Sequence, residues 1–65
     1  MIAAHQQRVI DERDDLAIKV DRLHAFLGTD TYAGLDVAER GRLDRQLAVM
    51  VIYRDILNER IVAFV

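Results

Sequence analysis

Arginine side chains are the groups in this sequence best suited to binding chemistry. Eight of its nine cationic residues are Arg, and Lys19 is the only Lys. A guanidinium binds a carboxylate or a phosphate through two parallel hydrogen bonds, whereas a Lys ammonium acts as a point charge. Two interpretations of this bias remain open. It indicates either ion pairs on a solvated surface or a local phosphate site in a chain whose net charge is −2.

Two groups of Arg are candidate anion sites. Arg8 and Arg60 are expected at the open end of a helical hairpin, and each can bind a phosphate. Arg45 lies near Arg40 and Arg42 at the start of the expected second helix. The free N–H groups and positive dipole end of a helix N-terminus favour an anion there. The alternatives are structural: Arg60 can pair with a carboxylate across the hairpin, and Arg45 with one on a neighbouring copy.

Three further side chains could recognise a nucleobase. Tyr53 can stack on a base, an interaction worth about 1–3 kcal/mol. His5 and Gln46 can form hydrogen bonds with base edges. The alternative for Tyr53 is an aromatic residue at a helix interface whose hydroxyl is satisfied there. The candidate ligand-binding residues are therefore Arg8, Arg60, Tyr53, Arg45, His5 and Gln46.

Catalytic and metal-binding constellations are not visible in the sequence. There is no Gly-rich phosphate loop, no H-E-x-x-H and no C-x-x-C. His5 and His24 would be separated by about 28 Å along one helix. The chain has no Cys and two His, which excludes a thiolate metal site and a zinc cluster. We expect no enzymatic activity, no metal and no cofactor.

Two long helices must position the candidate residues. Ile2, Val9, Leu16 and Leu23 recur every seven residues and predict a helix over residues 2–27. The stretch QLAVMVIYRDILNERIVAF carries an apolar side spaced by three, four and seven, and it predicts a helix over residues 37–64. With a turn over residues 28–36, the expected fold is a single all-α domain, residues 1–65. It is an antiparallel two-helix hairpin in which Leu16 lies opposite Tyr53.

The predicted turn has three features. Gly28 is expected to end the first helix in a left-handed conformation. Tyr32 to Leu35 are expected to form one helical turn that closes the hairpin. Asp36 and Glu39 match a capping box, which predicts that the second helix begins near Val37.

A second apolar side on the second helix indicates self-assembly. Val49, Ile52, Tyr53 and Ile56 add to the side that faces the first helix, although a lone hairpin needs only one such side. The core of a chain this small rarely supplies more than about 3–5 kcal/mol. We therefore expect a closed homo-oligomer with two-fold contacts through the second helix. A second interface is expected through Ile10, Ala17 or Ile18.

Composition limits the possible partners. The net charge of −2 argues against a protein that coats DNA or RNA. No apolar stretch approaches the length of about 20 residues that a membrane span requires. No apolar run follows Met1, so no signal peptide is visible, and we expect a cytoplasmic location.

The two stretches HQQRVIDERDDLAIKVDRLHAFL and LDVAERGRLDRQLAVMVIYRDILNERIVAF resemble a known domain. It is the helical hairpin of phage-encoded immune-evasion sponges, the anti-CBASS and anti-Thoeris proteins. The resemblance covers nearly the whole chain. The matching elements are Arg8-Val9, Glu12, Leu16, Lys19, Leu23 and Phe26 in the first helix, and Gln46, Met50, Tyr53, Leu57, Arg60 and Ile61 in the second.

This resemblance implies a function. Such proteins sequester cyclic nucleotide signals or cyclic ADP-ribose derivatives without cleaving them, and they are typically hexamers that hold ligands where protomers meet. Better-known sponges carry residues before the hairpin that complete some pockets. The present chain starts almost at the hairpin, which favours a cyclic trinucleotide pocket built by hairpins alone. The resemblance further implies a phage or prophage gene and a site of action in the host cytoplasm. The alternative is a structural or adaptor module whose apolar faces bind another protein.

Overall fold

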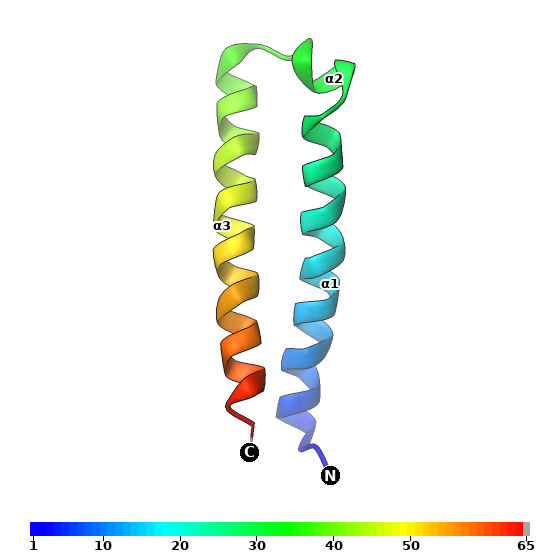
Figure 1. Ribbon diagram of the computed structural model, residues 1–65, viewed down its shortest axis with the longest axis vertical. Helices are drawn as coiled ribbons and strands as arrows, with labels where there is room; N and C mark the ends of the chain where they lie inside the picture. Colours follow the sequence, from blue (N-terminus) through cyan, green and yellow to red (C-terminus); the bar gives the residue numbers. More distant parts are fainter. Residues whose placement is uncertain (65) are drawn as a thin grey trace.

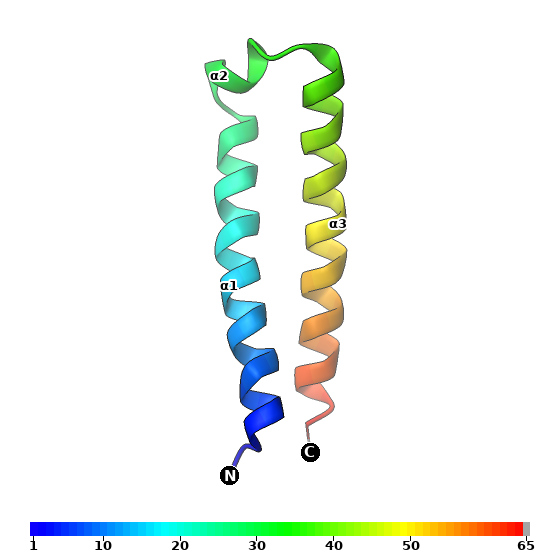
Figure 2. The ribbon, with the colours of Figure 1, turned by 180° about the vertical axis from the view of Figure 1, so that it is seen from behind.

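Two long antiparallel helices form the molecule. The computed structural model describes residues 1–64, so Val65 of the predicted domain lies outside the described residues. Helix α1 spans Ala4–Leu27, the short α2 spans Asp30–Ala33, and α3 spans Val37–Val62. Both views of the ribbon place α1 and α3 side by side, with the two chain ends at one end and α2 at the other (Figures 1 and 2). The described residues contain no strand, which confirms the all-α prediction.

The core lies in the seam between α1 and α3. Val9, Leu16 and Val20 from α1 are buried, and Leu57 from α3 is completely inaccessible to solvent. Partly buried apolar side chains of α3 and the chain end surround this cluster: Leu47, Met50, Val51, Ile61 and Phe64. The seven-residue spacing therefore identified the buried side of α1 correctly over its middle turns. Its first member, Ile2, is half exposed and precedes the helix.

The closed end differs from the prediction in its capping. Gly28 ends α1 with φ −89° and ψ 5°, which is not left-handed. The reason is that Thr29 satisfies the carbonyl oxygen of Phe26 twice, through its hydroxyl at 2.6 Å and its backbone N–H at 3.0 Å. Thr29 Oγ1 also accepts from Tyr32 N–H and caps α2, so the helical turn begins at Asp30 rather than at Tyr32.

The beginning of α3 was predicted correctly, but for the wrong reason. Asp36 precedes the helix in an extended conformation and makes no side-chain capping hydrogen bond. Glu39, the expected second member of the capping box, instead accepts from Arg42 Nε at 2.8 Å. Helix α1 begins two residues later than expected, at Ala4, and α3 ends two residues earlier, at Val62. Ends of helices fray readily because their terminal backbone groups lack intrahelical partners.

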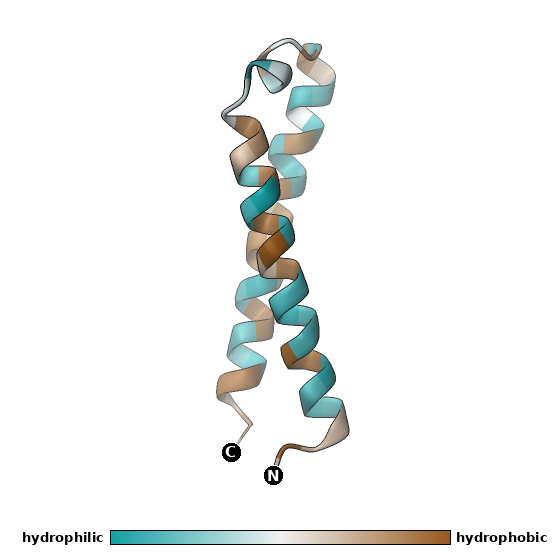
Figure 3. Cartoon of the chain, turned by 90° about the vertical axis from the view of Figure 1, so that its right-hand side faces the viewer, coloured by the Kyte–Doolittle hydropathy of each residue, from teal (hydrophilic) through white to brown (hydrophobic). Residues whose placement is uncertain are grey.

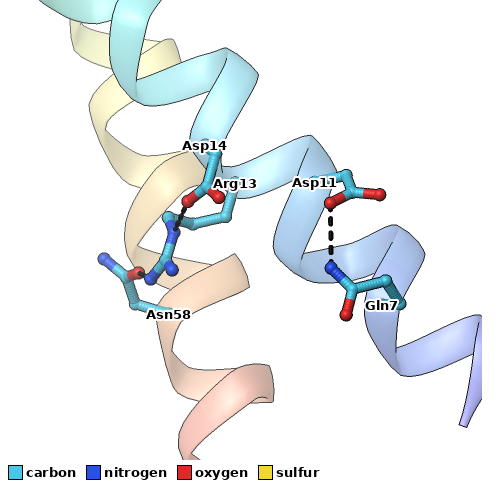
Figure 4. A network of polar contacts seen from close by, with 5 residues as sticks. All are labelled: Gln7, Asp11, Arg13, Asp14 and Asn58. Atoms are coloured by element: carbon cyan, nitrogen blue, oxygen red, sulfur yellow. Dashed lines mark hydrogen bonds and ion pairs between the residues drawn. The ribbon is translucent and has the colours of Figure 1, made fainter. Parts of the chain in front are cut away.

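A polar bridge links the helices on one side of the seam. Arg13 Nη1 donates to Asn58 Oδ1 at 2.8 Å, and Arg13 Nε donates to Asp14 Oδ1 at 2.8 Å (Figure 4). Because Asp14 follows Arg13 on the same helix, it orients the guanidinium toward α3. This bridge fixes the register of the two helices by joining the middle of α1 to the C-terminal part of α3.

The molecule is a rod that leaves much apolar surface in solvent. Its radius of gyration is 14.9 Å, whereas a compact chain of this length has one of about 10.7 Å. Its accessible surface is 4864 Å², compared with about 4,250 Å² for a compact monomer of the same mass. Apolar and polar turns alternate along both helices (Figure 3). Four large apolar side chains of α3 lie outside the core and are 41–65% exposed: Val49, Ile52, Tyr53 and Ile56.

Candidate functional site

A groove of about 400 Å³ runs between α1 and α3 on the side opposite the Arg13–Asn58 bridge. Leu16 of α1 and Tyr53 of α3, which the predicted antiparallel register places opposite each other, both line it. The remaining lining residues are polar and come from α1: Arg8, Asp11, Glu12, Asp15 and Lys19. The volume lies within the range of about 300–1,000 Å³ that is typical of small-molecule sites.

The spacing of the α1 residues explains why they share this groove. Asp11 and Asp15 are four residues apart, as are Arg8 and Glu12, so each pair lies on one side of a helix. All these polar side chains are exposed. Arg8 and Tyr53 are among the predicted site residues, whereas the carboxylates are not, although the four-residue spacing of Asp11 and Asp15 is visible in the sequence.

The charge of the groove does not favour a phosphate within one chain. Arg8 and Lys19 contribute two positive charges, and Asp11, Glu12 and Asp15 contribute three negative ones. Asp11 is also held by Gln7, whose Nε2 donates to Oδ1 at 3.0 Å (Figure 4). A phosphate beside Arg8 would therefore lie near carboxylates that repel it. The groove of a single chain is an incomplete anion site.

The other predicted site residues lie outside this groove. His5 and Arg60 are exposed near the open end, and Arg60 occupies the last turn of α3, where the helix dipole favours a cation. Arg45 is exposed on α3, and no salt bridge joins Arg45 or Arg60 to a carboxylate of residues 1–64. Gln46 Nε2 lies 3.7 Å from Met50 Sδ, a weak contact along its own helix. Of the six predicted ligand-binding residues, only Arg8 and Tyr53 line the groove.

The Arg cluster at the start of α3 is less open than expected. Arg42 is engaged by Glu39 in a salt bridge of 2.8 Å. Arg40 has a buried Nε without a hydrogen-bond partner among the described residues. Arg45, three residues after Arg42, has no salt bridge within residues 1–64. These three cations do not form one preformed site.

Two further findings concern metal binding and membrane insertion. Across residues 1–64, no group of three or more His, Asp or Glu is arranged to hold a metal ion. In the same part of the chain, neither long helix has the length and apolarity to cross a membrane.

Comparison with known proteins gives one match. The model of a protein family described as Sequestin matches residues 3–63, which include all three helices. No curated protein and no solved structure matches the chain.

Proposed function

Because the chain belongs to the Sequestin family, we propose that it binds cyclic nucleotide second messengers and sequesters them without cleavage. The ligand class is cyclic di- or trinucleotides or cyclic ADP-ribose derivatives. The family name fits the resemblance to the phage anti-CBASS and anti-Thoeris sponges. In this proposal the protein is a phage or prophage product that acts in the host cytoplasm, and it is not an enzyme.

The groove that joins Arg8 to Tyr53 is the observation that carries this proposal. It offers a guanidinium for a phosphate, an aromatic ring for a base and a volume suited to a small molecule. The carboxylates beside Arg8 prevent a single chain from being the complete site. We therefore place the ligand where protomers meet in a closed homo-oligomer, a hexamer, with Arg60, Arg45, His5 and Gln46 as further candidate contacts.

A thermal-shift panel tests this function. The protein is heated alone and with cyclic dinucleotides, cyclic trinucleotides and cyclic ADP-ribose derivatives. A ligand at 100 times its Kd adds about 2.7 kcal/mol, which raises the Tm of a domain of this size by more than about 10 °C. The linear nucleotide with the same bases is the matched control and should give a much smaller shift. Absence of a shift with every cyclic ligand would contradict the proposal.

The exposed apolar side chains of α3 support a second candidate function, an adaptor that binds another protein. Val49 and Ile52 are neighbours on one face of α3 and are 65% and 60% exposed. Contiguous exposed apolar surface marks protein interaction sites. The same thermal-shift panel separates the two functions, because an adaptor would not be stabilised by cyclic nucleotides.

A further inference from the structure

Glu12 is the carboxylate of the groove that lies nearest to α3. Leu16 is buried in the seam between the long helices. At 3.6 residues per turn, Glu12 lies about 40° from Leu16 around the axis of α1. The corresponding angles are about 100° for Asp15 and about 140° for Asp11, on the same side of the helix. Asp11 is in addition bonded to Gln7. Glu12 is therefore the carboxylate best placed to reach a molecule in the groove.

The Glu12 carboxylate keeps its hydrogen-bonding capacity for a ligand. No salt bridge and no side-chain hydrogen bond within residues 1–64 includes it. An ionised carboxylate is a pure acceptor and offers two oxygens side by side. A ligand in the groove therefore meets a pair of acceptors that can bind N–H or O–H groups.

Tyr53 lines the same groove from α3 and is 41% exposed. Glu12 lies four residues before Leu16, the residue opposite Tyr53, which is about 6 Å along the axis of α1. A base that stacks on the Tyr53 ring would turn an edge toward α1. The groove therefore combines an aromatic face from one helix with an acceptor pair from the other.

We propose that Glu12 reads the Watson–Crick edge of a guanine in the bound cyclic oligonucleotide. Among the four common bases, guanine has two neighbouring donors on this edge, the N1–H and the N2 amino group, and they match the two carboxylate oxygens. Adenine and cytosine place an acceptor nitrogen beside the amino group, and uracil has one N–H between two carbonyl oxygens. Those acceptors would face the carboxylate and be repelled by it. This inference rests on the proposed function and names the base that the site selects.

The two cations of the groove fit the phosphates of the same ligand. Arg8 lies four residues before Glu12 and Lys19 seven residues after it, on the same side of α1. These separations are about 6 Å and about 10 Å along the axis. Each nucleoside of a cyclic oligonucleotide has a phosphate on either side, so a cation on each side of the base-reading carboxylate matches its order. The guanine N–H groups also offset the charge of Glu12, which lessens its repulsion of a phosphate beside Arg8.

Isothermal titration with matched ligands tests the selection of guanine. Three cyclic oligonucleotides share the ring size that gives the largest thermal shift and carry guanine, adenine or hypoxanthine as their bases. Hypoxanthine is guanine without the N2 amino group. We expect the guanine ligand to bind about ten-fold more tightly than either of the others, or more, which is the effect of one hydrogen bond to a charged group. Equal affinity for the guanine and hypoxanthine ligands would overturn the proposal.

Glu12→Gln tests the residue itself, and its exposed position makes a loss of folding unexpected. A side-chain amide has one acceptor and one donor group, which match the amino group and the neighbouring ring nitrogen of adenine. The variant should therefore bind the guanine ligand about ten-fold more weakly or worse and prefer the adenine ligand. Asp15→Asn is the matched control, because it removes the same charge from the same groove and should change both affinities by one factor. An unchanged ratio of the two affinities in Glu12→Gln would overturn the proposal.

Two further outcomes separate this inference from its alternatives. A ligand with 2′-deoxyribose in place of ribose should bind Glu12→Gln and the natural chain with the same ratio as the ribose ligand. A loss on deoxygenation that disappears in Glu12→Gln would show that the carboxylate holds the sugar, and it would overturn the base readout. Binding of cyclic nucleotides without any preference for guanine would overturn the inference and leave sequestration standing, whereas failure of every cyclic ligand to bind would overturn both.

Discussion

The hydroxyl of Tyr32 donates a hydrogen bond of 2.6 Å to Asp44 Oδ1. Tyr32 belongs to α2 and Asp44 to the second turn of α3, so this bond ties the short helix to the long one. The ring of Phe26, near the end of α1, meets Tyr32 edge-on at a centroid distance of 6.3 Å. Through this hydrogen bond and this aromatic contact, Tyr32 joins both long helices at the closed end.

This hydrogen bond predicts a pH dependence of stability. Donation to the Asp44 carboxylate raises the pKa of Tyr32 above its ordinary value of 10.0. A raised pKa in the folded state means that folding favours the neutral phenol. The stabilisation is complete below pH 10 and is lost as the pH rises through the raised pKa.

Tyr32→Phe should accordingly lower the Tm at pH 7 by a small amount, and this difference from the natural chain should vanish at strongly alkaline pH. The measurement is thermal unfolding of both proteins across that range. Tyr53→Phe is the matched control, because no hydrogen bond of the Tyr53 hydroxyl is present within residues 1–64. A Tm difference that stays constant up to pH 12 would show that the bond does not contribute.

The Arg13–Asn58 bridge predicts that substitution of Asn58 lowers the stability of the fold. Asn58→Ala removes the acceptor for Arg13 Nη1 and should lower the free energy of unfolding by about 1 kcal/mol, because the pair is only partly buried. Urea denaturation followed by circular dichroism measures this change. Gln7→Ala, which removes an exposed hydrogen bond within α1, should cost less. Equal effects of the two substitutions would contradict a special role for the bridge.

Truncation of Leu57 should lower the free energy of unfolding more than truncation of any other side chain. Its side chain in the seam is completely buried, and Leu→Ala at such sites costs about 2–5 kcal/mol. That is most of the stability that the core of one small chain supplies. Chemical denaturation should therefore show a partly unfolded Leu57→Ala protein. Val62→Ala, at a position 78% exposed, should change the stability by less than about 0.5 kcal/mol.

The hairpin and its core were predictable because they follow from periodicity. The seven-residue spacing identified Val9 and Leu16, and the surplus apolar side of α3 was recognised before Val49 and Ile52 were seen to be exposed. Helix patterns of this length are strong signals because each turn repeats the same information. The match to the Sequestin family confirms the resemblance read from the two helices.

Local hydrogen bonds at the closed end were harder to predict. Asp36 and Glu39 match a capping box in the sequence, but the Glu39 carboxylate instead forms a salt bridge with Arg42. Tyr32 reaches Asp44, twelve residues away, through a contact that no local motif encodes. The groove was predicted only through Arg8 and Tyr53, because exposed carboxylates such as Asp11 and Asp15 are typical of an ordinary solvated helix face.

Single Arg substitutions separate the candidate phosphate contacts. Arg8→Ala and Arg60→Ala should each weaken cyclic nucleotide binding by about ten-fold or more, which is the loss expected for a hydrogen bond to a charged group. Arg45→Ala tests the other predicted contact in the same way. Isothermal titration measures affinity, and sedimentation shows whether assembly is intact. Arg42→Ala is the control, because Glu39 already engages that guanidinium. Unchanged affinity in all three variants would place the ligand elsewhere.

The fate of a bound cyclic nucleotide tests sequestration most directly. The protein is incubated for hours with the ligand that gives the largest thermal shift, free ligand is removed by filtration, and the protein is then denatured. We predict that chromatography recovers the retained nucleotide chemically intact, in a fixed ratio to the protein chain. Recovery of a linear product, or no retained nucleotide at all, would contradict the account.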